Sequence, residues 1–149
     1  MVEVTAGKIS SRSKVIYELL QLEKFEVHKA SELLTYQFLE LLEENFPIND
    51  DTSAIQFRFP SQFADRLNVH VNYLNRALKE TLNKTTTEVI TIRVLHEAKR
   101  LLLQRNWNIS DIAYALLFNE PTHFNNFFKK NTNVSPSKFR QIELKRTKS

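Results

Sequence analysis

The sequence contains no cysteine and a single glycine among its 149 residues. Without cysteine, neither a disulfide framework nor a zinc site with thiolate ligands can form, and the four histidines lack the HxxxH and HExxH spacings of metal sites. One glycine also argues against a glycine-rich phosphate loop, and no carboxylate pair or nucleophile with a base stands at useful spacing. The sequence therefore predicts no enzyme, no metal and no cofactor.

Long hydrophobic runs are missing as well. No segment approaches the roughly 20 apolar residues that span a bilayer, and the N-terminus lacks the pattern of a signal peptide. We expect a soluble, cytoplasmic protein with no membrane partner. Its 42% hydrophobic content is enough to bury a real core, and the scarcity of glycine and proline favours helices.

The net charge of +4 is unevenly distributed. Residues 1–50 hold 5 Lys and Arg against 9 Asp and Glu, whereas residues 51–149 hold 16 against 8. This concentration of positive charge suits a polyanionic partner such as nucleic acid, although solvated surface lysines would give the same count.

A pattern of helix, turn and helix begins at Asn108. Apolar residues at spacings of three and four give a short first helix one buried face, made of Ile109, Ile112, Ala113 and Leu116. A turn at Asn119 and Glu120 leads into a second helix that starts at Pro121. This helix has phenylalanines on one side and polar or basic residues on another, namely Thr122, Asn125, Asn126 and Lys129. The polar side is either a contact surface or an ordinary solvated face.

The same pattern occurs earlier, over about residues 61–83. Ser61 is expected to cap a first helix, and a turn at residues 68–70 leads into a second helix. This second helix also exposes asparagines and basic residues, namely Asn72, Asn75, Arg76 and Lys79. Two such units form an internal repeat of helix-turn-helix type, which is far more specific than either copy alone.

One continuous helix is expected between the units, over about residues 87–104. Its length of roughly 27 Å would hold two recognition helices about one DNA turn apart. Asn68, Asn83 and Asn133 follow predicted helices in a chain almost without glycine. Asparagine is the other residue that tolerates the left-handed backbone conformation, so we expect that conformation at these three positions.

The N-terminal part is also expected to be helical, after a leader over residues 1–10. Apolar residues cluster on one side of helices predicted at residues 13–24 and 28–46. This helical hairpin either covers the core of the same chain or pairs with another copy, and the sequence leaves both roles open. Residues 54–59 alternate briefly like a strand and are expected to be extended or a helical turn.

These features resemble the AraC/XylS family of bacterial transcription regulators over about residues 38–143. The residues that match the family signature are Ile109, Asp111, Ile112, Ala113, Phe118, Phe124, Phe128, Lys129, Lys130, Ser135, Pro136, Phe139 and Arg140. Arg93, Ala98, Leu101 and Leu102 match the linker helix. Two glycines that are usual in the family are replaced, by Leu117 and by Asn133. The change at Leu117 puts the geometry of its turn in question.

The resemblance implies an all-α fold with two helix-turn-helix subdomains, at about 61–83 and 109–132, joined by the linker helix. This homeodomain-like DNA-binding domain would occupy residues 28–149. Residues 1–27 would be a leader and a helix, and the helix at 13–24 resembles the dimerisation helix of a sensor domain. A second copy, bound through these N-terminal helices, and RNA polymerase are therefore candidate partners.

The resemblance further implies that the second helix of each unit enters the major groove of double-stranded DNA. The base-reading positions would be Asn72, Asn75, Arg76, Pro121, Thr122, Asn125 and Asn126, with Arg76 suited to guanine and Asn75 to bidentate pairing with adenine. Candidate phosphate contacts are Lys79, Lys129, Lys130, Lys138 and Arg140, although Arg140 could instead brace the fold through a salt bridge. The implied protein is a sequence-specific regulator such as an activator, associated with the nucleoid. The alternative is a helical protein-interaction module that binds DNA only nonspecifically.

Overall fold

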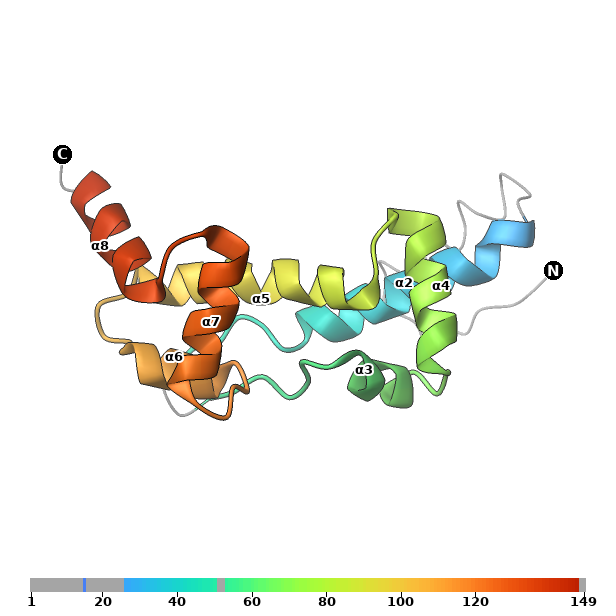
Figure 1. Cartoon of the computed structure of the whole chain (residues 1–149). Helices are drawn as coiled ribbons and strands as arrows, with labels where there is room; N and C mark the ends of the chain where they lie inside the picture. Colours follow the sequence, from blue (N-terminus) through green and yellow to red (C-terminus); the bar gives the residue numbers. More distant parts are fainter. Residues whose placement is uncertain (1–14, 16–25, 51–52, 148–149) are drawn as a thin grey trace. The chain divides into compact units, whose positions relative to one another are not determined.

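The structure, a computed structural model, describes residue 15, residues 26–50 and residues 53–147 (Figure 1). Within these ranges every regular element is a helix, which confirms the all-α expectation. The helices are α2 (Glu26–Glu43), α3 (Pro60–Arg66), α4 (Val71–Leu82), α5 (Thr86–Leu102), α6 (Ile109–Ala115), α7 (Pro121–Thr132) and α8 (Pro136–Arg146). The helix expected at residues 13–24 lies outside the described residues apart from Val15.

The chain divides into two compact units. The first unit contains α2 and Phe59–Val89, and the second contains Asn45–Arg58 together with the residues from Ile90 onward. Each unit includes one helix-turn-helix, α3–α4 in the first and α6–α7 in the second. Helix α5 begins in the first unit and continues into the second.

The core of the first unit forms where α2 packs against α3 and α4. Phe38 of α2 meets Phe63 of α3 edge to face, with ring centroids 5.2 Å apart, a contact worth about 1 kcal/mol beyond area burial. Leu74 and Leu78 of α4 are fully buried. Helix α2 therefore covers the core of its own unit, whereas the other helix of the expected hairpin lies outside the described residues apart from Val15.

Phenylalanine rings dominate the core of the second unit. Phe118, Phe124, Phe127, Phe128 and Phe139 form a chain of contacts with centroid distances between 5.1 and 5.9 Å. Helix α5 lines this core with buried residues, namely Val94, Ala98, Leu101 and Leu102. Ile92 of the same helix is 55% exposed.

Residues 45–58 connect α2 to α3, and their described part has no regular structure. Ile55 donates its backbone N–H to the carbonyl of Ala115 at 2.9 Å. The side-chain oxygen of Asn45 accepts from the N–H of Gln56 at 2.9 Å. These bonds satisfy backbone groups that a strand partner would otherwise satisfy, which explains why the alternating pattern at 54–59 forms no sheet.

A buried carboxylate attaches this segment to α5. Glu97 is 1% exposed and accepts hydrogen bonds from the Ile48 N–H at 2.7 Å and from Arg100 at 2.7 Å. Arg100 also donates to the carbonyl of Ile48 at 2.7 Å. Burial alone would raise the pKa of Glu97, but these hydrogen bonds and the charges of Arg100 and Arg93 outweigh burial and lower that pKa.

We expect Glu97→Gln to lower the free energy of unfolding at pH 7 by about 2 kcal/mol, because it weakens charged hydrogen bonds. A lowered native pKa means that the ionised Glu97 stabilises the fold above its ordinary pKa of 4.5 and loses this contribution as pH falls through the native value. Urea unfolding at pH 7, 5 and 3 should therefore show a smaller acid loss for Glu97→Gln than for the natural chain. Equal acid losses would contradict the assignment.

Left-handed residues end several helices. Asn68, Asn83 and Asn133 have φ values of 59°, 56° and 69°, which confirms the expectation for all three. Leu117, with φ of 66°, is the fourth such residue among those that the structure describes. This conformation destabilises a non-glycine residue by roughly 1–2 kcal/mol, and asparagine tolerates it best after glycine.

Asn83 allows a clean test of this cost because its side chain is exposed. We expect Asn83→Ala to lower the free energy of unfolding by about 1 kcal/mol, whereas Asn83→Gly should leave it unchanged or raise it. Urea unfolding followed by circular dichroism measures both variants. Equal losses in the two variants would show that the side chain, and not the backbone conformation, is responsible.

Candidate nucleic-acid interface

The two helix-turn-helix units share one hydrogen-bond pattern at the end of their first helix. In the first unit Leu67, Asn68 and Val69 donate to the carbonyls of Phe63, Asp65 and Ala64. In the second unit the donors are Leu116, Leu117 and Phe118, and the acceptors are Ile112, Tyr114 and Ala113. Each pair of equivalent residues lies 49 positions apart, so the predicted repeat extends to individual backbone bonds.

The second turn contains one additional residue. Helices α4 and α7 both have 12 residues, starting at Val71 and Pro121, so equivalent residues now lie 50 positions apart. The same spacing persists beyond the αL residues Asn83 and Asn133. The repeated unit thus includes two complete helices and the start of a third.

The first helix of the first unit does not start where the sequence indicated. Helix α3 begins at Pro60, with Phe59 as the N-cap, so Ser61 lies inside the first turn and is not the cap. The backbone N–H of Phe59 donates to the side chain of Gln62 at 2.9 Å. Proline suits the first helical position because its missing N–H needs no partner there.

The turn around Leu117, which the sequence left in question, is held by Arg58. The guanidinium of Arg58 donates to the carbonyl of Leu117 at 3.2 Å and lies 3.9 Å from the centroid of the Phe118 ring. Burial lowers the pKa of Arg58, yet an arginine stays cationic under all ordinary conditions. Sequence analysis missed this role, because the contact joins residues 59 positions apart.

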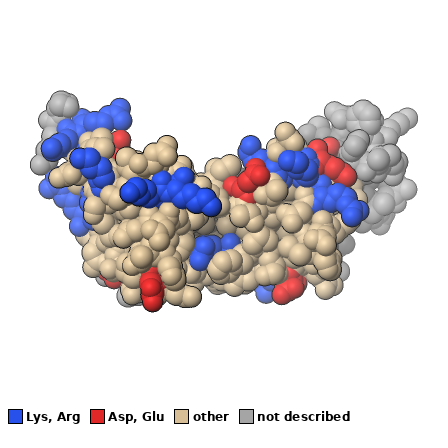
Figure 2. Space-filling model, viewed as in Figure 1, with Lys and Arg blue, Asp and Glu red and all other residues tan. Residues whose placement is uncertain are grey.

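On α4, three of the predicted DNA contacts are exposed: Asn72, Arg76 and Lys79. The helix starts with a cap from His70, whose Nδ1 accepts the N–H of Asn72 at 3.1 Å. An acidic residue, Glu80, follows Lys79 and accepts a hydrogen bond from Ser31 of α2 at 2.6 Å. In Figure 2, the Lys and Arg side chains over α4 accordingly lie among Asp and Glu.

On α7, the predicted contacts are exposed apart from Pro121, which is half-buried. The exposed residues are Thr122, Asn125, Asn126, Lys129 and Lys130. Lys138 of α8 is also exposed. Lys and Arg side chains gather over α7 and α8 in Figure 2. Cations near the C-terminal end of α7 also offset the negative end of its helix dipole.

Asn75 has a structural role that the sequence did not reveal. It is half-buried, and its side-chain oxygen accepts the backbone N–H of Thr86 at the start of α5, at 3.0 Å. Bidentate pairing with adenine requires that same oxygen, which in the structure already accepts the Thr86 N–H. The equivalent residue in the second unit, Asn125, meets no such donor, because the residue equivalent to Thr86 is Pro136, which has no N–H.

Arg140 braces the second unit, but not through a salt bridge. Its guanidinium donates to the backbone carbonyls of Leu102 at 2.7 Å, Gln104 at 3.4 Å and Trp107. These are carbonyls at and beyond the end of α5, which lack helical partners. Burial lowers the pKa of Arg140 without removing its charge.

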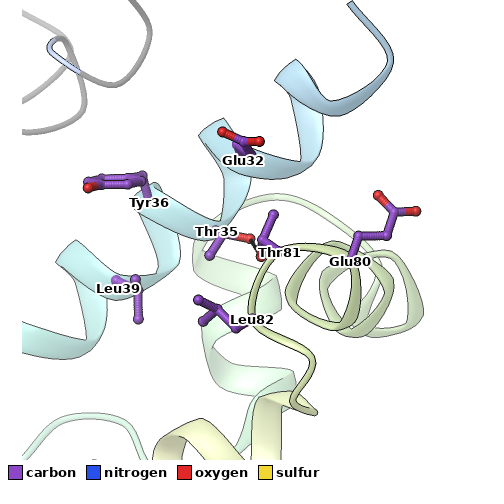
Figure 3. A pocket seen from close by; sticks show the side chains of 7 residues that line it. All are labelled: Glu32, Thr35, Tyr36, Leu39, Glu80, Thr81 and Leu82. Carbon is purple, nitrogen blue, oxygen red and sulfur yellow. Dashed lines mark hydrogen bonds between the residues drawn. The ribbon is translucent and has the colours of Figure 1, made fainter. Parts of the chain in front are cut away.

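A pocket of about 490 Å³ lies between α2 and α4 in the first unit (Figure 3). It is lined by Glu32, Thr35, Tyr36, Leu39, Glu80, Thr81 and Leu82. Two of these residues, Thr35 and Thr81, share a hydrogen bond of 2.8 Å. The two carboxylates make this pocket unsuited to a polyanion. Within the described part of the chain, no helix has the length and apolar character to cross a membrane, and no cluster of residues could hold a metal ion.

The geometry defines a protein with two tandem helix-turn-helix units, and comparison with known proteins agrees. A family described as "Helix-turn-helix domain", of the AraC type, matches residues 63–142. The chain belongs to this family.

Two curated relatives are named as regulators. The chain is 25% identical over 135 residues to the uncharacterized HTH-type transcriptional regulator YisR of Bacillus subtilis, covering 88% of the chain and 44% of YisR. It is 29% identical over 105 residues to the HTH-type transcriptional activator RhaS of Yersinia pestis, covering 70% of the chain and 36% of RhaS. The chain thus spans less than half the length of these relatives.

A solved structure shows the same fold. The DNA-binding domain of AdpA, a global transcriptional factor solved in complex with a target DNA, superposes with a TM-score of 0.59 at 16% identity. The match covers 75% of this chain and 94% of the AdpA domain. This similarity supports the all-helical fold described above.

The difference between Asn75 and Asn125 generates a prediction about stability. We expect Asn75→Ala to destabilise the start of α5 by about 1 kcal/mol, because the buried Thr86 N–H loses its acceptor. Asn125→Ala, the matched control, should change stability by less than about 0.5 kcal/mol. Hydrogen exchange of the Thr86 amide, compared in the two variants, measures this effect. Equal exchange rates in both would contradict it.

Proposed function

We propose that this chain is a sequence-specific, double-stranded DNA-binding regulator of transcription. The observation that carries the proposal is the repeated helix-turn-helix geometry, in which α4 and α7 each present exposed polar and basic side chains. Membership of the AraC-type family supports it. So do the name of RhaS as a transcriptional activator and the presence of target DNA in the AdpA complex.

In this proposal α4 and α7 are recognition helices that enter the major groove. Side chains near the start of such a helix reach base edges. In the first unit the readers are Asn72, Asn75 and Arg76, with Arg76 suited to the two acceptors of guanine. In the second unit they are Thr122, Asn125 and Asn126, with Pro121 at the edge of the contact. The polar, uncharged readers of α7 favour adenine-containing sites.

Lysines provide the phosphate contacts in the proposal. Lys79, Lys129, Lys130 and Lys138 are all exposed, and each can approach the DNA backbone without breaking a described interaction. Such contacts add affinity without sequence information. We leave Arg140 out of this set, because its guanidinium bonds to three carbonyls of its own unit.

One chain is proposed to occupy two successive major grooves. Both units belong to one chain and share α5, a continuous helix of 17 residues and hence roughly 26 Å long. The sites of successive grooves on one face of DNA lie about 34 Å apart. A bipartite binding site with two cores about one turn apart follows from this proposal.

The wider role is that of a bacterial activator in the cytoplasm, associated with the nucleoid and working with RNA polymerase. Pairing with a second copy through the helix expected at residues 13–24 is part of the same proposal, as is the lack of catalytic activity. A protein-interaction module with incidental basic charge is a weaker alternative, because it does not account for the exposed reading positions in both units.

Selection of binding sites from a random duplex pool at near-physiological salt tests the proposal. The expected result is a bipartite motif with two cores about one helical turn apart. Binding without any motif, with steep salt dependence, would reduce α4 and α7 to nonspecific contacts. Loss of all DNA binding would reject the proposal.

Two substitutions separate base reading from phosphate binding. Arg76→Ala should weaken binding to the selected site by about 1–3 kcal/mol and relax the preference at one base. Lys129→Ala should weaken binding to all sequences alike and reduce the slope of log affinity against log salt concentration by about 1. Titrations of specific and random duplex at several salt concentrations measure both effects. If Arg76→Ala lost equal affinity for both duplexes, its reading role would be wrong.

A further inference from the structure

We infer that Asn75 meets DNA through its amide N–H groups alone, so that the first unit selects an acceptor-bearing base there, whereas the equivalent Asn125 selects adenine. This inference rests on the proposed function and deepens it by assigning base preferences. Its origin is a single difference between the units. The residue that begins the helix after the recognition helix is Thr86 in the first unit and Pro136 in the second.

The hydrogen bond to Thr86 determines which way the Asn75 amide is oriented. A backbone N–H can only donate, so the atom 3.0 Å from it must be the amide oxygen of Asn75. Thr86 has an exposed fraction of 0%, so water cannot replace this acceptor. Withdrawing the oxygen to meet a base would leave a buried donor unsatisfied, which is costly. Although the oxygen has a second lone pair, its bond to the Thr86 N–H directs it toward the start of α5, and the two amide hydrogens are the groups that Asn75 offers to DNA in this inference.

An amide that offers DNA only its N–H groups distinguishes between bases. In the major groove adenine presents one acceptor and one donor, so a bidentate asparagine must supply both its oxygen and its nitrogen. Guanine presents two acceptors, and thymine presents one acceptor without a neighbouring donor on the same base. Asn75 accordingly favours guanine or thymine and loses the second bond that adenine would give.

The second unit lacks the constraint. Pro136 occupies the position equivalent to Thr86 and has no N–H to capture the oxygen of Asn125. Asn125 is also exposed, whereas Asn75 is half-buried. Both polar atoms of Asn125 can therefore pair with adenine, and two asparagines at equivalent positions acquire different base preferences.

Exchanging the two helix-starting residues tests the inference directly. Thr86→Pro removes the N–H that captures the oxygen of Asn75, and proline is favoured at the first position of a helix. The Thr86 hydroxyl is buried without a hydrogen-bond partner in the described structure, so its removal breaks no such bond. Pro136→Thr is the reciprocal change. Binding-site selection is run on the natural chain and on both variants.

The base that Asn75 reads is identified as the position whose preference disappears in Asn75→Ala. At that position we expect Thr86→Pro to shift selection toward adenine by about tenfold. At the base read by Asn125, Pro136→Thr should reduce adenine selection by a similar factor. If Thr86→Pro folds and leaves the preference unchanged, the inference is overturned.

A second variant keeps the test decisive if Thr86→Pro does not fold. Asn75→Asp retains an oxygen for the Thr86 N–H but removes both amide hydrogens, so the fold should persist while preference for guanine or thymine falls about tenfold. An unchanged preference would overturn the inference. Failure of the proposed function looks different, because the natural chain itself would then select no motif.

Discussion

The fold depends on a backbone constraint: the chain must adopt a left-handed conformation after several helices, and it has almost no glycine with which to do so. Asn68, Asn83 and Asn133 meet this requirement with the side chain best suited to replace glycine. Leu117 meets it with a side chain that is poorly suited. Each reversal within the helix-turn-helix units and each stop after a recognition helix falls at one of these four positions.

Contacts between residues distant in sequence hold Leu117, the residue least suited to the left-handed conformation. Similar contacts fix the long connection between α2 and α3. Arg58 holds the carbonyl of Leu117 and covers the neighbouring Phe118 ring. Glu97 and Arg100 fix the start of the same connection through both backbone groups of Ile48. Residues 45–58 therefore serve as a brace of the second unit rather than as a simple link.

The two units share one backbone pattern but differ in the hydrogen bonds of equivalent side chains. Their backbone bonds correspond position by position, and their recognition helices have equal lengths. The units differ in the first residue of the helix that follows. The N–H of Thr86 binds the oxygen of Asn75, whereas Pro136 has no N–H that could bind the oxygen of Asn125. Different residues at such positions give the two units different surfaces without any change of fold.

Much of the architecture was predictable from local patterns. Helical spacing of apolar residues predicted α2 and the linker helix α5, and the repeat predicted both helix-turn-helix units. The left-handed asparagines were predictable because the reason for them is local: a helix ends and glycine is missing. Where local signals competed, prediction failed. The sequence favours Ser61 as a cap, whereas in the structure Pro60 starts the helix and Gln62 satisfies the backbone N–H of Phe59.

Periodicity within short segments was enough to predict the helical class, the repeated units and the exposed polar positions of α4 and α7, with the half-buried Asn75 as the exception. Only the tertiary structure decided the roles of Arg58, Glu97, Asn75 and Arg140. Their partners lie between 3 and 59 positions away, and most are backbone groups whose availability depends on where a helix starts or ends. A side chain that the sequence pattern assigns to base reading or phosphate binding gains a structural contact once such a group lies beside it.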